Sequence, residues 1–189
     1  MVLILRPATA GTSPTADVDC PACGDTLAPW GYARARSVRD VHGTRELKPH
    51  RVRCRGCRAT HVLLPAACLP RRADTAEVIG AALLAAAAGA GHRRIAADIH
   101  RPAGTVRGWI RAAIVHAPRL REHATALTHR FDTGLSPIRP ARTVLADAVE
   151  ALGAAVAAST RRLGPRGPAW ELITWLTNGQ LLAPLARTG

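Results

Sequence analysis

Two pairs of cysteines limit how this chain can fold. Cys20 and Cys23 form the first pair, Cys54 and Cys57 form the second, and two residues separate the cysteines within each pair. That gap lets both thiolates of a pair face one metal ion. Four sulfur ligands complete a tetrahedral shell and leave no position for water or a substrate, so the spacing predicts one structural Zn²⁺ ion and not a catalytic metal.

Zinc fits these pairs better than the other roles of paired cysteines. Disulfide frameworks belong to secreted chains, and residues 1–6 hold too few apolar side chains for a signal peptide. A redox centre needs one pair in a strand–helix–strand unit, not two matched pairs. Because four sulfurs fill the shell, we expect His42, His50 and His61 to be surface or strand residues. Cys68 is expected to be a small buried apolar residue.

Arginine supplies nearly all of the positive charge. The chain has 189 residues and a formal net charge of +13, with Lys48 as its single lysine. Arginine forks onto phosphates and guanine edges, so the composition favours a nucleic-acid partner. Genome base composition can produce the same bias, and this alternative stays open. The longest apolar run, residues 78–91, is too short for a membrane span, so we expect a cytoplasmic, nucleoid-associated protein without a membrane partner.

Changes in composition divide the chain into four expected segments of an α+β fold that is mostly α. Residues rich in Pro, Thr, Gly and Ala come first, the cysteines follow, and helical periodicity takes over after Pro70. The expected segments are a flexible arm at 1–19, a small β zinc ribbon at 20–70, a helix-turn-helix domain at 71–117 and a C-terminal helical region at 118–189.

The cysteine-bearing segment has the pattern of short strands. Residues 30–38 and 45–54 suit two antiparallel strands, and residues 60–64 suit a third. Each cysteine pair is expected to lie in a tight knuckle. Gly24 and Gly56 are expected to permit backbone angles that other residues resist.

Three helices are expected next. Asp74, with Glu77 three residues later, predicts a capping box at the start of a helix that ends near Ala88. Residues 92–100 and 105–111 then form two short helices around a tight turn. Their apolar side chains have helix-turn-helix spacing, with a small residue where the helices cross: Ile95, Ala96, Ile99, Val106 and Trp109.

The second of these two helices is the expected recognition helix. Arg107 and Arg111 are four residues apart on its outer face and are expected to reach base edges. The residues expected to contact phosphates are Arg93, Arg94, Arg101 and Thr105. The turn has His100 and Arg101 where this motif usually has glycine and an apolar residue, so an ordinary helical hairpin stays open.

Several motifs carry a resemblance to a known family. They are the Cys-Pro-Ala-Cys-Gly knuckle at 20–24, Arg-Cys-Arg-Gly-Cys at 53–57, Thr-His-Val-Leu-Leu-Pro at 60–65, Ile-Ala at 95–96 and Thr-Val-Arg-Gly-Trp at 105–109. In this order they resemble the zinc-ribbon and helix-turn-helix region at the N-terminus of insertion-sequence transposases, and related small bacterial proteins of unknown function. The likeness covers residues 20 to about 115. It implies that the ribbon and the helix-turn-helix, with the cysteines and arginines named above, bind element-end DNA.

The catalytic part of such transposases is missing from the sequence pattern. A ribonuclease-H type domain needs three separated carboxylates that hold two metal ions. Past residue 115 the acidic residues lie in alanine-rich helical sequence with too little chain for a mixed sheet: Glu122, Asp132, Asp147, Glu150 and Glu171. We therefore expect no enzymatic activity.

The C-terminal region has an apolar stripe on a helix expected from about residue 142 to 162. Its residues recur at helical spacing: Leu145, Val149, Leu152 and Val156. A last short helix is expected around Trp170, Ile173 and Leu176. We expect the stripe to pack inside the chain, on the helix-turn-helix, and a homodimer through the stripe is the alternative.

Two classes of function follow. The first is a zinc-stabilised protein that binds double-stranded DNA, either associated with a transposon and a transposase or integrase partner, or acting as a transcriptional regulator. The second is a protein-interaction adaptor whose arginines contact acidic surfaces. Salt dependence separates them, because contacts to several phosphates weaken steeply as salt rises.

Overall fold

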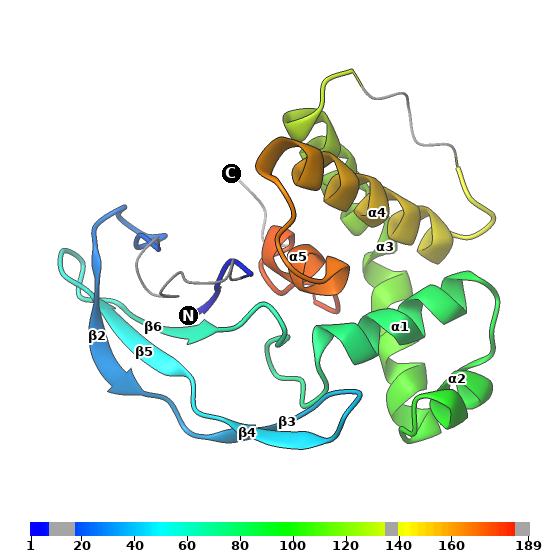
Figure 1. Cartoon of the computed structure of the whole chain (residues 1–189), viewed down its shortest axis with the longest axis horizontal. Helices are drawn as coiled ribbons and strands as arrows, with labels where there is room; N and C mark the ends of the chain where they lie inside the picture. Colours follow the sequence, from blue (N-terminus) through cyan, green and yellow to red (C-terminus); the bar gives the residue numbers. More distant parts are fainter. Residues whose placement is uncertain (8–17, 135–139, 184–189) are drawn as a thin grey trace.

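The strands of the chain come first and the helices follow. The computed structural model describes residues 1–7, 18–134 and 140–183, and within them it contains six strands and five helices (Figure 1). The α+β class expected from the sequence is therefore confirmed, and helices hold more of these residues than strands do.

The larger sheet has four strands in the order β1-β6-β5-β2. Its strands are β1 (Val2–Ile4), β2 (Leu27–Tyr32), β5 (His50–Cys54) and β6 (Thr60–Leu64). β5 pairs antiparallel with both β2 and β6. β6 matches the third expected strand, and β2 is left at the edge of the sheet, on the side away from the helices (Figure 1).

The flexible arm expected at 1–19 is wrong for its first residues. β1 lies parallel to β6, with Val2 opposite Val62, and Leu3, Ile4 and Leu5 are buried. Burial of these side chains and the added ladder of hydrogen bonds fix the segment, although its own sequence carries no turn or period that announces a strand. Residues 8–17 lie outside the described residues, so the rest of the arm stays a prediction.

Each of the two long strands expected at 30–38 and 45–54 is divided. The second sheet consists of β3 (Arg36–Arg39) and β4 (Thr44–Leu47), which pair antiparallel with each other. Gly31 has a φ of 84°, in the left-handed region, and Pro49 has no N–H to donate to a ladder. The register of β2 shifts between Pro29 and Tyr32, where the strand ends, and β4 ends at Leu47, before Pro49. The ribbon is therefore divided into two pairs of strands.

The helices are α1 (Ala76–Ala87), α2 (His92–Asp98), α3 (Ala103–Phe131), α4 (Val144–Leu163) and α5 (Ala169–Leu176). α3 has 29 residues and continues through Pro118, so the domain boundary expected at residue 117 falls inside one helix and is wrong. Ala113, Ala117, Leu120 and Ala124 are buried along α3. Their packing continues past the proline and offsets the backbone hydrogen bond that a proline removes.

All five helices contribute to one hydrophobic cluster. α3 packs along α4, and the apolar stripe of α4 faces this cluster, with Leu145 and Leu152 buried and Val149 and Val156 partly buried. The intramolecular packing expected for the stripe is confirmed, which leaves the stripe unavailable as the dimer face considered above.

The helical cluster and the sheets meet at Asp74. We expected this residue to cap α1 in a box with Glu77, and that assignment is wrong. Thr75 is the N-cap, and its Oγ1 accepts from the N–H of Val78. Because the helix starts one residue later than expected, the Asp74 carboxylate is free to bind two arginines from other elements.

A second contact joins the two halves through the sheet. Trp175 of α5 packs against the apolar cluster formed by Ile4, Leu64 and Ala66. In the described part of the chain, no helix is both long and apolar enough to cross a membrane.

Candidate metal centre and nucleic-acid interface

Two knuckles of the same backbone shape carry the four cysteines. In the first, the N–H of Gly24 donates to the carbonyl of Cys20 at 2.7 Å, and Gly24 has a φ of 75°. In the second, the residue after the last cysteine is Arg58, which also has a positive φ, 63°. In both knuckles the backbone thus turns through the left-handed region directly after the second cysteine of the pair.

Gly56 serves the second knuckle in a different way from the one expected. Its φ lies outside the left-handed region, so the knuckle does not need glycine there for its backbone angles. A Cβ at this position would instead lie 2.5 Å from the carboxylate of Asp25. Gly56 therefore provides space between the two knuckles.

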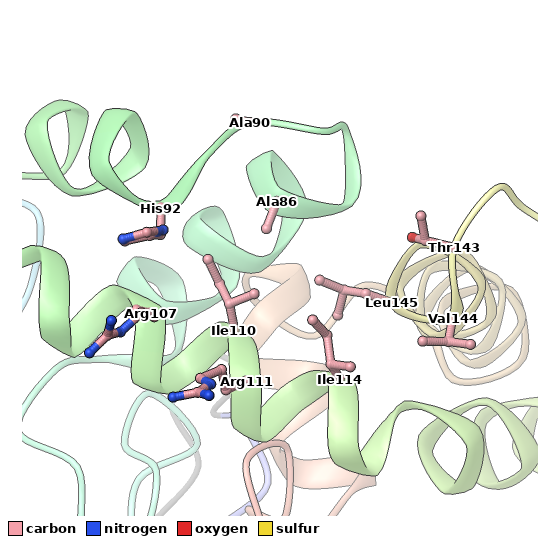
Figure 2. A pocket seen from close by; sticks show the side chains of 10 residues that line it. All are labelled: Ala86, Ala90, His92, Arg107, Ile110, Arg111, Ile114, Thr143, Val144 and Leu145. Atoms are coloured by element: carbon pink, nitrogen blue, oxygen red, sulfur yellow. The ribbon is translucent and has the colours of Figure 1, made fainter.

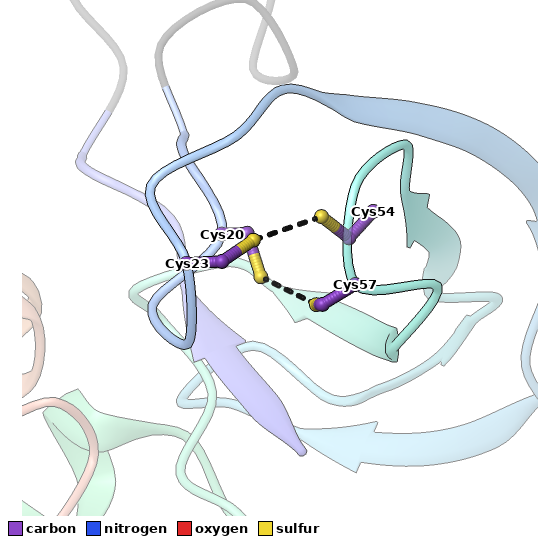
Figure 3. A group of neighbouring side chains, drawn as sticks. All are labelled: Cys20, Cys23, Cys54 and Cys57. Atoms are coloured by element: carbon purple, nitrogen blue, oxygen red, sulfur yellow. Dashed lines mark hydrogen bonds between the residues drawn. The ribbon is translucent and has the colours of Figure 1, made fainter.

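The knuckles bring the four sulfurs into one group (Figure 3). The Sγ atoms of Cys20 and Cys57 are 3.6 Å apart, those of Cys23 and Cys54 are 3.4 Å apart, and all four lie within 4.8 Å of one another. A tetrahedral ion with metal–sulfur bonds of about 2.3 Å places its ligands about 3.8 Å apart. The four cysteines therefore form a cluster of the size that holds a metal ion such as zinc.

The chemistry of the cluster also calls for a cation. A hydrogen bond from the backbone at Asp25, with further bonds from Cys54 and Cys57, lowers the pKa of the Cys23 thiol to about 7. At Cys57 the backbone of Ala59 lowers the pKa, but the three neighbouring sulfurs raise it, to about 12 on balance. Four thiols this close cannot all ionise at neutral pH on their own, whereas a divalent ion replaces their protons.

His61 lies next to the cysteine cluster. Its side chain is buried, and Nε2 lies 3.6 Å from the sulfur of Cys20. Burial lowers the pKa of His61, so the ring is neutral at neutral pH and keeps one N–H. With that proton on Nε2 the ring donates to a Cys20 thiolate and fixes its direction. The sequence predicted a strand position for His61, and the structure adds this contact.

The helices α2 and α3 form the second candidate site. Ile95, Ala96, Val106 and Trp109 are buried where these helices pack, and Ile99 is partly buried beside them. The small side chain of Ala96 and the apolar positions around it thus occupy the interior, as their spacing predicted.

The turn between α2 and α3 is a tight helix ending. The N–H of Arg101 donates to the carbonyl of Ala96 at 2.9 Å, and the N–H of His100 donates to the carbonyl of Ala97 at 3.2 Å. This is the Schellman pattern, in which the residue at the position of His100 is usually glycine. His100 takes the left-handed conformation itself, with a φ of 52°. The turn therefore keeps its shape without the glycine that the sequence lacks.

Arg101 does not fit the role predicted for it. Its Nε donates to the Asp74 carboxylate at 2.6 Å, and its Nη2 donates to the carbonyl of Asp40 at 3.0 Å. Only 14% of the side chain is exposed. Arg101 is thus committed to contacts within the protein, and the prediction that it binds a phosphate is inconsistent with this structure.

The other predicted contact residues lie on the outside. Arg93 and Arg94 of α2 and Arg107 and Arg111 of α3 are exposed, and Thr105 is half-buried in the first turn of α3. Within the described residues, none of these four arginines has an ion pair or a side-chain hydrogen bond. Their guanidinium groups are therefore available to a ligand.

A cavity of about 250 Å³ adjoins the exposed arginines of α3 (Figure 2). Arg107 and Arg111 line it together with His92 at the start of α2, and Leu145 at the start of α4 contributes to its apolar part. Figure 2 shows the two arginines on α3 below His92, and Ile114 of the same helix pointing toward Leu145. Part of the cationic surface is thus hollowed and not flat.

Two exposed aromatic residues were missed by the sequence interpretation. Trp30 and Tyr32 lie on the edge strand β2 and are each 53% exposed. Their spacing of two residues in a strand next to arginine-rich sequence was the available signal.

A known family model matches part of the chain. The family model described as a domain of unknown function, DUF6431, matches residues 20–109. The range starts at the first cysteine of the cluster and ends at Trp109 of α3, so one model takes in both cysteine pairs and the turn between α2 and α3. It also crosses the boundary expected at residue 70. No curated protein and no solved structure matches the chain.

Proposed function

We propose that this chain is a DNA-binding protein in which a zinc ribbon supports a helix-turn-helix. Cys20, Cys23, Cys54 and Cys57 would hold one Zn²⁺, which ties together a β segment with little apolar core of its own. In this proposal α2 and α3 are the two helices of the motif, and the start of α3 enters the major groove of a duplex.

The arrangement of α3 around its axis carries the proposal. Val106 and Trp109 are 0% and 3% exposed, whereas Arg107 and Arg111 lie on the solvent side of the same turns. A helix that buries one face and presents unpaired arginines four residues apart on the other has the geometry needed for bidentate contacts to guanine. The formal net charge of +13 supports a polyanionic partner.

The remaining exposed groups divide by position. Arg93 and Arg94 lie at the start of α2, and Thr105 lies in the first turn of α3. In helix-turn-helix complexes the first helix crosses the backbone and the second reads bases. We therefore assign Arg93, Arg94 and Thr105 to phosphate contacts, which add affinity without reading sequence.

The biological setting we propose is association with a mobile element, and transcriptional regulation is the second setting. The support for the first is the resemblance of the motifs at 20–24, 53–57 and 105–109 to the transposase N-terminal region. No catalytic step is part of the proposal.

The proposal is tested by binding of the full chain to a mixed duplex pool between about 50 and 200 mM salt. We expect the logarithm of the association constant to fall linearly with the logarithm of the salt concentration. Arg107→Ala and Arg111→Ala are each expected to weaken binding of the tightest-binding duplexes in the pool about tenfold at low salt, which corresponds to the usual value of a base contact.

Arg130→Ala is the matched control for these variants. Arg130 is an exposed arginine on the same helix, 23 residues away and thus about 35 Å along the axis. The Arg130→Ala variant should bind duplex DNA as tightly as the wild type. Absence of duplex binding at about 50 mM salt, or equal effects of Arg107→Ala and Arg130→Ala, would overturn the proposal.

A further inference from the structure

The placement of aromatic side chains on β2 is unusual for this chain. It has four Trp, one Tyr and one Phe in 189 residues. Trp109 and Trp170 are buried and Trp175 is partly buried, but Trp30 and Tyr32 are each 53% exposed. Rings of this size usually bury 150–250 Å² and stabilise a core. Two of the six Trp, Tyr and Phe rings thus lie on the surface of a single edge strand.

Each exposed ring has a cation beside it. The guanidinium of Arg53 lies 4.7 Å from the centroid of the Trp30 ring, and the Lys48 ammonium lies 5.0 Å from that of Tyr32. The ring of His50 lies 4.7 Å from the Tyr32 ring. Lys48 is the only lysine of the chain. Each exposed ring of β2 therefore lies within about 5 Å of a positively charged group.

The surrounding charge is strongly positive. Residues 27–58 contain nine Arg or Lys residues and two acidic residues, Asp40 and Glu46. Asp40 already pairs with Arg45 at 3.5 Å. A ligand for this surface must therefore offer flat apolar faces and negative charge together.

The outer edge of β2 is poorly suited to a pairing strand. Pro29 has no N–H, Gly31 has a φ of 84°, and the register of β2 is irregular between Pro29 and Tyr32. A partner that adds a strand needs a regular row of N–H and C=O groups. The side chains, not the backbone, are thus the recognition elements of this edge.

We propose that Trp30, Tyr32, Lys48 and Arg53 form a binding site for single-stranded nucleic acid. Unpaired bases stack on the two rings, while Lys48 and Arg53 contact the adjoining phosphates. Bases within a duplex hide their faces in the stack, so this site discriminates in favour of unpaired strands. It is separate from the duplex site proposed on α3, and DNA and RNA share the chemistry that it recognises.

The test measures binding of the full chain to oligo(dT), oligo(U) and an abasic oligonucleotide of the same length, by anisotropy and by quenching of tryptophan emission. Both base-containing strands are expected to quench the emission, because a stacked base contacts the Trp30 ring. The abasic strand keeps the phosphates but has no base faces to stack, so it should bind more weakly and quench little of the tryptophan emission. The ratio of the affinities for oligo(dT) and oligo(U) shows whether the site prefers DNA or RNA.

The substitutions separate stacking from charge. Trp30→Ala and Tyr32→Ala are each expected to weaken binding of oligo(dT) about 5- to 150-fold, the usual range for a lost base–ring contact. Trp30→Phe keeps a ring and should retain most of the affinity. Leu84→Ala is the control, because Leu84 is an apolar side chain of similar exposure, 55%, on α1.

The inference is overturned if the abasic strand or polyglutamate binds as tightly as oligo(dT), which would indicate a general anion surface or an acidic protein partner. Wild-type affinity of both Trp30→Ala and Tyr32→Ala would also overturn it. The two sites fail separately: Trp30→Ala should leave duplex binding unchanged, and Arg107→Ala should leave oligo(dT) binding unchanged.

Discussion

The Nε of Arg101 lies 2.6 Å from Oδ1 of Asp74, and this contact joins the turn between α2 and α3 to the residue that precedes the N-cap of α1. The Asp74 side chain is 3% exposed, and its other oxygen accepts from Arg39 of β3 at 2.7 Å. One buried carboxylate therefore holds a strand, a helix start and a helix turn in fixed positions. The sheet of β3 and β4 is thus joined to the turn before α3 through one side chain.

Asp74→Asn should lower the free energy of unfolding by roughly 3 kcal/mol, because it leaves the largely buried guanidinium of Arg101, and that of Arg39, without their counter-charge. Urea denaturation measures the loss. Asp98→Asn is the control, since Asp98 is an exposed acidic residue on α2, and it should change the stability by less than about 0.5 kcal/mol. Equal losses in the two variants would contradict the role of Asp74 as a joint.

Removal of metal should unfold the β segment first. A chelator is expected to lower the melting temperature of the wild type. Without the metal ion, ionised cysteines repel one another, and protonated cysteines are no longer held together by a common ion. Cys54→Ser should remove the stoichiometric metal, whereas Cys68→Ala should keep it, since Cys68 is buried outside the cluster. Elemental analysis measures the metal content, and circular dichroism measures the melting temperature. A melting temperature that the chelator does not change would contradict the prediction.

His61→Phe is expected to weaken metal binding by about 10- to 100-fold, because the ring loses the N–H that orients the Cys20 thiolate. Phenylalanine keeps a buried ring of similar size, so packing in β6 should change little. Competition against a chelating dye gives the metal affinity. His42→Phe, at an exposed position, is the control, and the idea fails if the two variants hold metal equally well.

His100→Gly should stabilise the fold by about 0.5–1 kcal/mol, because glycine has no Cβ penalty at a φ of 52°. Gly89 occupies the same place at the end of α1, with a φ of 96°, so Gly89→Ala should destabilise by a similar amount. Thermal denaturation of both variants checks the pair. A lower melting temperature for His100→Gly would show that its side chain contributes more than its backbone costs.

Local signals were sufficient for part of this structure. The two-residue gaps between cysteines predicted the sulfur cluster, and helical periodicity placed α1, α2 and α4 close to their observed bounds. Both kinds of signal depend on neighbours within a few residues. They are therefore readable without knowledge of the fold.

Contacts between distant parts of the chain account for the errors. β1 exists because it pairs with β6, some sixty residues away, and its own sequence does not announce it. Asp74 resembled a helix cap until its two arginine partners were placed by β3 and by the turn before α3. A domain boundary was expected at residue 117, but packing against α4 continues α3 beyond it. In each case tertiary packing overrides a local preference.

Selection of binding sites from random duplexes tests the central claim most directly, namely that α3 reads DNA sequence. The wild type should enrich a defined sequence, and Arg107→Ala should relax the preference at one position of that sequence. Arg93→Ala should bind every duplex more weakly and still select the wild-type sequence. A wild type that enriches no sequence, or an Arg107→Ala variant that selects as the wild type does, would contradict the account.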